Sequence, residues 1–245
     1  SKVSDKPDIQ PFEFFRDLYN TIENENISVD LTGGNDSRFI VSALQKLGAD
    51  FELALSGLPS NTDIKIAQKL SKILNKKFHP YYHRIDNLHD KELEDIFDFT
   101  DGQVDIVVYH RIYHYYKNKS RRDITFQISG VGGALYKDFG WLQDFPFYSK
   151  RKFSLSKFYD LRIESIKFKH NVLGESLQSF SKNLRDKKLR ELNSLVLSTN
   201  SETYDNIFYY YKMQTMGGTF LTLSNRFFKS YAPLLELELA KYGFD

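Results

Sequence analysis

The sequence predicts an α/β fold in which helices cover both faces of a parallel β-sheet, followed by a mainly helical C-terminal part. Within the first 150 residues, short apolar runs alternate with segments whose apolar residues recur at helical spacing. Two of the short runs open into glycine-containing turns. Beyond about residue 150, long stretches rich in Lys, Leu, Ser and Phe replace the strand patterns. Strands that alternate with helices are typical of parallel sheets with right-handed crossovers.

The predicted elements follow in regular order along the chain. An amphipathic helix is expected at 11–24, with Pro11 at its N-terminus. Gly48 ends the second helix, and Asn61 caps the third. The later helices are expected at 37–47, 63–74, 88–99 and 103–117, and the strands at 27–31, 51–55, 77–82 and 123–128. Ligands of such folds bind beyond the carboxyl ends of the strands.

This pattern divides the chain into an α/β domain at 1–150 and a helical extension at 151–245, which we expect to pack together as one structural unit. The chain begins with Ser1 rather than Met and ends at Asp245 without a turn signal or a polar tail. We therefore expect it to be a piece of a longer protein.

Composition excludes several classes of function. Lys and Arg number 34 against 32 for Asp and Glu, so a net charge of +2 favours neither nucleic acid nor a membrane as the main partner. The absence of Cys excludes disulfides, thiol catalysis and Cys-based metal sites. No apolar run reaches the roughly 20 residues that span a bilayer, and no signal peptide is apparent. We expect a cytoplasmic protein.

The loop from Leu31 to Arg38, Leu-Thr-Gly-Gly-Asn-Asp-Ser-Arg, is the strongest functional motif. A glycine pair between a strand and a helix lets backbone amides form a cradle for phosphate at the positive end of the helix. Thr32 and Ser37 add hydroxyl groups, and Asp36 adds a carboxylate that can hold magnesium on the phosphates. The alternative is an ordinary strand-to-helix turn with a capping side chain. The motif lacks the Lys of the commoner phosphate loop, so a kinase or GTPase of that type is not indicated.

These residues resemble the Ser-Gly-Gly-x-Asp-Ser pyrophosphate loop of the N-type ATP pyrophosphatases, specifically the asparagine synthetase family, with Thr32 in place of the first Ser. Further stretches are similar to that family in the same order, so that the resemblance covers roughly residues 11–245. They are the segment from Gly57 to Gln68, the segment Ser-Gly-Val-Gly-Gly-Ala-Leu-Tyr from Ser129 to Tyr136, and Asn225-Arg226 with Tyr231 to Leu235.

The resemblance implies a Rossmann-like fold of the adenine-nucleotide alpha-hydrolase kind that binds ATP and Mg²⁺. It implies activation of a small carboxylate substrate as an acyl-adenylate, with release of pyrophosphate, for amide formation. A glutaminase domain or another ammonia source is the implied partner. The implied nucleotide-binding residues are Leu31, Thr32, Gly33, Gly34, Asp36, Ser37, Ser56, Gly57 and Gly130, with Asp36 as the magnesium ligand through the phosphates and Leu31, Ser56 and Gly57 facing the adenosine.

The chain departs from the family where the signature has acidic groups. Val131, Ala134 and Leu135 stand there instead. A metal clamp contributes several kcal/mol of charge stabilisation, so this loss should slow catalysis unless another group substitutes. The nearby candidates are Lys137, Asp138 and Asp144. The alternative reading is therefore a catalytically inactive pseudoenzyme or interaction module. A transfer-RNA-modifying member of the superfamily ranks last, because it predicts a strongly basic face or Cys residues.

Several other residues have the chemistry of a possible site. His110 and His114 are four residues apart on a predicted helix, a spacing that can bind a metal. No Glu or third ligand accompanies them in the motif, so a packed or solvated helix face is the favoured interpretation. Pro80 argues against one helical turn joining His79 and His83. A dinucleotide fingerprint at 130–135 is rejected because Leu135 replaces its third Gly. A basic cluster is interpreted as a solvated loop rather than an anion site: Lys117, Lys119, Arg121 and Arg122.

Overall fold

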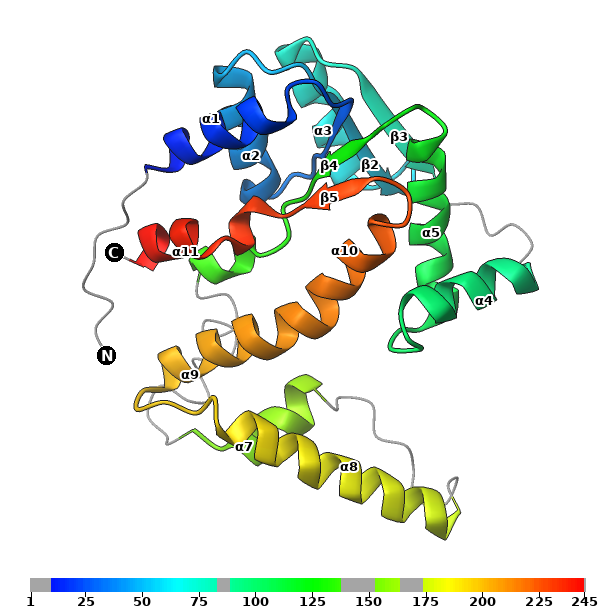
Figure 1. Ribbon diagram of the computed structural model, residues 1–245, viewed down its shortest axis with the longest axis vertical. Helices are drawn as coiled ribbons and strands as arrows, with labels where there is room; N and C mark the ends of the chain where they lie inside the picture. The colour runs from blue at the N-terminus through cyan, green and yellow to red at the C-terminus, as the bar shows by residue number, and fades with distance from the viewer. Residues whose placement is uncertain (1–9, 83–88, 138–152, 164–173, 245) are drawn as a thin grey trace. The chain divides into compact units, whose positions relative to one another are not determined.

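The structure is a computed structural model of the 245-residue chain, and it describes residues 10–82, 89–137, 153–163 and 174–244 (Figure 1). The chain forms two compact units. The first contains residues 1–136 and 216–245, and the second contains residues 137–215. Each is described by itself.

The first unit is built on a five-stranded parallel sheet. In register, Val29 pairs with Leu53 on one side and with Ile128 on the other. The strands are β1 (Ile27–Asp30), β2 (Glu52–Gly57), β3 (Phe78–Tyr82), β4 (Phe126–Ile128) and β5 (Lys229–Tyr231), in the spatial order β3-β2-β1-β4-β5. The chain first builds outward from β1 to β3 and then returns to add β4 and β5. The carboxyl ends of β1 and β4 therefore form a topological switch point, where such folds bind ligands.

Helices cover both faces of this sheet, as the sequence predicts (Figure 1). Leu53 belongs to one hydrophobic core and Ala54 to the other, because successive residues of a strand point to opposite faces. The first core includes residues of α1 (Pro11–Ile22), α2 (Asn35–Lys46), α3 (Thr62–Leu74) and α11 (Leu237–Phe244). The second includes residues of α4 (Asp90–Phe99), α5 (Ile106–Ser120) and α10 (Gly218–Ser224).

Local sequence signals explain where several elements begin and end. Pro11 is the first residue of α1, where its missing amide hydrogen costs nothing. Gly48 follows α2 with φ of 72°, a conformation that favours glycine. The Asn61 side chain accepts a hydrogen bond of 2.8 Å from the Asp63 amide and caps α3. The helices and strands predicted between residues 11 and 128 are confirmed.

The second unit is helical in its described residues. It contains α7 (Leu155–Phe158), the π-helical turn η2 (Tyr159–Ile163), α8 (Glu175–Asn193) and α9 (Asn200–Ile207), and the π-helical segment η3 (Phe208–Gly217) leads from α9 to α10. Its small core consists of Phe158, Tyr159, Leu192, Tyr204 and Ile207. Among the described residues of the whole chain, no helix has both the length and the apolar character needed to cross a bilayer.

The division of the chain differs from the expected boundary at residue 150. Residues 216–245 return to the sheet-containing unit, because Lys229 to Tyr231 form the edge strand β5 beside β4. A helical extension running from 151 to the C-terminus was therefore the wrong interpretation of this last stretch. The strand has three residues, two of them polar, so it shows no alternating pattern that sequence analysis can detect.

Candidate functional site

A cavity of about 400 Å³ lies at the carboxyl ends of β1, β2 and β4, within the sheet-containing unit. Its polar border comes from the loop after β1, through Thr32, Asp36 and Ser37, and from the loop after β4, through Ser129 and Gly130. Leu55 and Ser56 of β2 also line it. An opposite wall is formed by Ile112, Tyr115 and Tyr116 of α5 and by Phe220, Leu221 and Ser224 of α10.

The loop after β1 is held closed by its own hydroxyl groups. The Thr32 amide donates to Ser37 Oγ at 3.0 Å, and the two hydroxyl oxygens are also 3.0 Å apart. The Gly34 amide donates to Thr32 Oγ1 at 3.0 Å. This turn starts α2 directly at the cavity, so the positive end of the helix dipole lies beside Asp36 and Ser37. The local arrangement suits an anion.

Four of the residues assigned to nucleotide binding are not among those that line the cavity. The Leu31 side chain is fully buried in the first hydrophobic core, and its amide donates to the Ala54 carbonyl at 3.0 Å. The Gly33 amide donates to the Asp63 carboxylate at 2.9 Å. Gly34 and Gly57 do not border the cavity either.

The glycine turn after β4 packs directly on the N-terminus of α2. A Cβ atom at Gly130 would lie 3.3 Å from the Ser37 backbone nitrogen. A Cβ atom at Gly133 would overlap the carboxylate of Asp36. Gly132 has φ of 98°, which side chains rarely adopt. Glycine at 130 and 133 therefore lets the turn after β4 approach the N-terminus of α2 closely, and this contact positions the Asp36 carboxylate.

The positions that depart from the family signature are apolar in their packing as well. Val131 lines the cavity, and Leu135 is buried at 3% exposure in the 3₁₀-helix η1 (Gly133–Lys137). Ala134 is half-buried. Of the proposed substitutes, Lys137 ends η1 with a side chain outside the described part of the structure, and Asp138 and Asp144 also lie outside the described residues.

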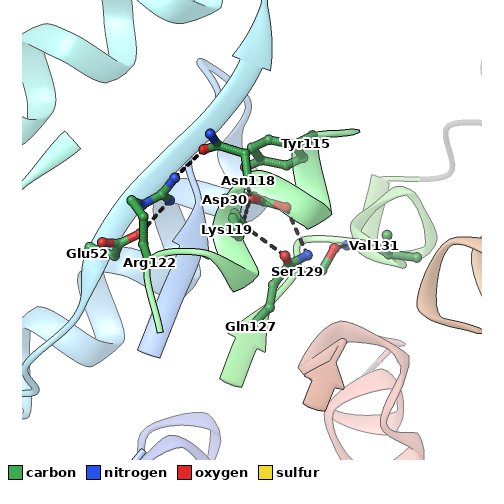
Figure 2. Close-up of polar contacts among 9 residues, drawn as sticks. All are labelled: Asp30, Glu52, Tyr115, Asn118, Lys119, Arg122, Gln127, Ser129 and Val131. Atoms are coloured by element: carbon green, nitrogen blue, oxygen red, sulfur yellow. Dashed lines mark hydrogen bonds and ion pairs between the residues drawn. The ribbon is translucent and has the colours of Figure 1, made fainter. Parts of the chain in front are cut away.

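A buried polar network forms the base of the cavity (Figure 2). Lys119 Nζ of α5 donates to Asp30 Oδ1 of β1 at 2.6 Å and to Gln127 Oε1 of β4 at 2.8 Å. Asp30 also accepts the Tyr115 hydroxyl at 2.5 Å and the Gln127 amide at 3.1 Å. Burial lowers the pKa of Lys119, and the Asp30 carboxylate opposes that shift. Burial and the same carboxylate raise the pKa of Tyr115 well above its usual value.

The interpretation of the basic cluster as a solvated loop is wrong for Lys119 and Arg122. Lys119 is completely buried, and Arg122 donates to Glu52 at 2.8 Å beside β2 (Figure 2). Lys117 Nζ lies 2.9 Å from Glu92 Oε1. The sequence shows the charges but not their carboxylate partners, because all the partners come from other elements.

The structure also gives His110 and His114 the third potential ligand that was absent from their sequence motif. Glu92 of α4 brings its Oε2 atom to 3.2 Å from His110 Nε2 and 2.9 Å from His114 Nε2, and the two Nε2 atoms are 3.0 Å apart. Burial raises the pKa of Glu92. This effect is outweighed by a hydrogen bond from Lys117, by the charges of His114 and Lys117, and by a hydrogen bond from His110, so that the pKa falls to about 2. The histidine spacing was a detectable signal, whereas Glu92 is 18 residues away from His110 and carried none.

No protein-family model matches the chain, and no curated protein is significantly similar to it.

Proposed function

We propose that the sheet-containing unit binds ATP with Mg²⁺ in the cavity between β1 and β4, as an asparagine synthetase-like domain of the adenine-nucleotide alpha-hydrolase kind. One observation carries this proposal: the loop after β1 and the glycine turn after β4 converge at the switch point of the sheet, so that Thr32, Asp36, Ser37 and Gly130 border one cavity. The cavity volume of about 400 Å³ lies in the range of small-molecule and cofactor sites.

The phosphate groups bind at the polar end of the cavity. The hydroxyl groups of Thr32 and Ser37 and the N-terminus of α2 face that end. The residues also fit a magnesium ion, because such ions are usually held by one or two carboxylates together with phosphate oxygens and water, and Asp36 supplies one carboxylate. The ion would neutralise charge on the phosphates. Leu55 and Ser56 of β2 border the adenosine end.

The reaction that this arrangement serves is activation of a small carboxylate substrate. A carboxylate oxygen attacks the α-phosphorus of ATP, the bond to the bridging oxygen of the β-phosphate breaks, and pyrophosphate leaves. A nitrogen nucleophile then displaces AMP from the acyl-adenylate and forms an amide, with ammonia from a glutaminase domain or another source. We further propose that the protein works in the cytoplasm, where ATP and magnesium are available.

A second candidate function is ATP binding without turnover. Val131 borders the cavity and Leu135 is buried, so these two positions supply no carboxylate for a second metal ligand or a general acid. A pseudoenzyme of this kind keeps the nucleotide site and loses pyrophosphate release.

Calorimetric titration of magnesium-ATP tests nucleotide binding, with GTP as a second ligand. The wild type is compared with Asp36→Ala and with the matched control Asp50→Ala, which removes a fully exposed carboxylate just before the amino end of β2. We expect binding by the wild type and the control, and at least about tenfold weaker binding by Asp36→Ala, because a charge-assisted contact contributes roughly 1.5–3 kcal/mol. Absence of binding by the folded wild type would refute the proposal.

Pyrophosphate release separates the two candidate functions. The protein is incubated with magnesium-ATP and single carboxylates, with ammonium as the nitrogen source. Release that depends on one carboxylate supports the ligase. Binding of ATP without release in the presence of any carboxylate tested supports the pseudoenzyme.

A further inference from the structure

Three potential metal ligands meet where α4 and α5 pack together, and none of them lines the nucleotide cavity. Their atoms, Glu92 Oε2, His110 Nε2 and His114 Nε2, form a triangle with edges of 3.2, 2.9 and 3.0 Å. Glu92 and His110 are buried, with side-chain exposures of 12% and 7%, and His114 is 31% exposed. The group is therefore set into the protein and still reachable from solvent.

Hydrogen atoms alone cannot satisfy this triangle. Each Nε2 atom carries at most one hydrogen, and the ionised Glu92 carboxylate carries none. If both rings are protonated at Nε2 and donate to Oε2, two N–H groups crowd each other at 3.0 Å. If His110 or His114 is unprotonated at Nε2, its lone pair faces the carboxylate oxygen at 3.2 or 2.9 Å. A cation bound by Oε2 and both Nε2 atoms would replace these unfavourable contacts with metal–ligand bonds.

The geometry and the ligand types select a class of metal. Around a tetrahedral Zn²⁺ with bonds of about 2.0–2.1 Å, neighbouring ligand atoms lie about 3.3 Å apart. The observed edges are within a few tenths of an ångström of that spacing. Imidazole nitrogen favours zinc and related transition metals over Mg²⁺ and Ca²⁺, which prefer oxygen ligands. Three protein ligands leave a fourth position for water.

The surrounding residues fit a metal site that joins two helices. Lys117 Nζ holds the other carboxylate oxygen of Glu92 at 2.9 Å, which leaves Oε2 for the ion, as outer-shell partners of metal ligands commonly do. His110 and His114 are one helical turn apart on α5, the spacing of zinc-binding histidine pairs. In zinc proteases that spacing includes a glutamate after the first histidine, whereas this chain has Arg111. The site therefore lacks the general base that those proteases place beside the metal.

We propose that Glu92, His110 and His114 bind one divalent transition-metal ion, with Zn²⁺ the best fit, which fastens α4 to α5. The site is independent of the proposed nucleotide binding. Its structural consequence is local: the opposite side of α5 carries Ile112 and Tyr115, which line the cavity, so the ion holds the helix that forms one cavity wall.

The test uses protein without a histidine tag, stripped with a chelator and titrated with Zn²⁺ in excess Mg²⁺. We compare the wild type with His114→Gln, which alters the most exposed ligand, and with the control His79→Gln, which alters a single His–Glu pair at 3.2 Å on β3. We expect one Zn²⁺ per chain in the wild type and the control. His114→Gln should weaken binding by roughly 100-fold or more, since loss of an outer-shell partner alone costs 10–100-fold. Saturating Zn²⁺ should raise the Tm of the wild type by roughly 5–10 °C.

Substitution with Co²⁺ provides a readout that does not depend on a variant. One equivalent of Co²⁺ should give the intense visible bands of a tetrahedral site in the wild type, and Zn²⁺ should remove them. The proposal is overturned if the folded wild type binds no stoichiometric Zn²⁺, if it lacks those bands, or if His114→Gln binds Zn²⁺ as tightly as His79→Gln does.

Discussion

Replacing Lys119 by Met tests the buried network at the base of the cavity. The side chain of Lys119 is completely buried, and its ammonium group lies 2.6 Å from Asp30 and 2.8 Å from Gln127. Met has a similar length and keeps the apolar packing of the stem, whereas the contact of the ammonium group with the Tyr115 ring is lost. The substitution therefore removes the charge and leaves the Asp30 carboxylate without its cation.

The expected cost follows from the surroundings of Asp30. Removing one partner of a buried ion pair typically costs roughly 3–5 kcal/mol. The Asp30 side chain is 24% exposed and keeps the hydrogen bonds from Tyr115 and Gln127, so we expect the lower end of that range, about 3 kcal/mol. For a chain of this size, the same loss corresponds to a fall in Tm of about 6–12 °C. Adding Asp30→Asn to Lys119→Met should recover at least half of the loss.

Urea denaturation followed by far-ultraviolet circular dichroism measures the loss, and native-state hydrogen exchange of β1 and β4 amides assigns it to the sheet-containing unit. The control is Lys91→Met, which removes an exposed lysine 3.1 Å from Asp95 and should cause no measurable change. A cost of less than about 1 kcal/mol for Lys119→Met, or a double variant no more stable than the single variant, would show that the Lys119–Asp30 pair does not stabilise the unit in this way.

Two further predictions concern backbone positions. Gly133→Ala should displace the Asp36 carboxylate, weaken magnesium-ATP binding and destabilise the unit by roughly 1–3 kcal/mol, measured by calorimetry and urea denaturation. The control Gly174→Ala, where a Cβ atom meets nothing within 4 Å, should change neither ATP binding nor stability. Equal behaviour of the two variants would contradict the close approach of Gly133 to Asp36. Asn61→Ala should cost about 0.5–2 kcal/mol by removing the cap of α3, and an unchanged denaturation midpoint would show that the 2.8 Å bond to the Asp63 amide does not stabilise the helix.

Local patterns explain why most of the sheet-containing unit could be predicted. Apolar spacing in α1, the glycine stop after α2 and the Asn61 cap of α3 are signals that lie within a few residues of the structure they specify. The loop at Leu31 to Arg38 and the glycine turn after Ser129 were also visible as motifs. Both follow parallel strands, whose carboxyl ends lie at one edge of the sheet, and the structure brings the two loops together there.

What the sequence did not reveal depends on partners distant along the chain. Lys119 looked like a solvated charge near a helix end, and only Asp30, 89 residues away, explains its burial. Glu92 joins His110 across two helices, and no local spacing links them. The strand Lys229–Tyr231 is defined by pairing with β4 rather than by its own composition.

The proposed function requires that a nucleotide binds where the loops after β1 and β4 meet. Hydrogen exchange of the wild type with and without saturating magnesium-ATP tests the location directly, since it reports on each segment of the chain. We predict slower exchange in segments 31–38 and 129–133, and no such change in Asp36→Ala at the same ATP concentration. Exchange that stays unchanged in both segments while calorimetry shows ATP bound would contradict the claim.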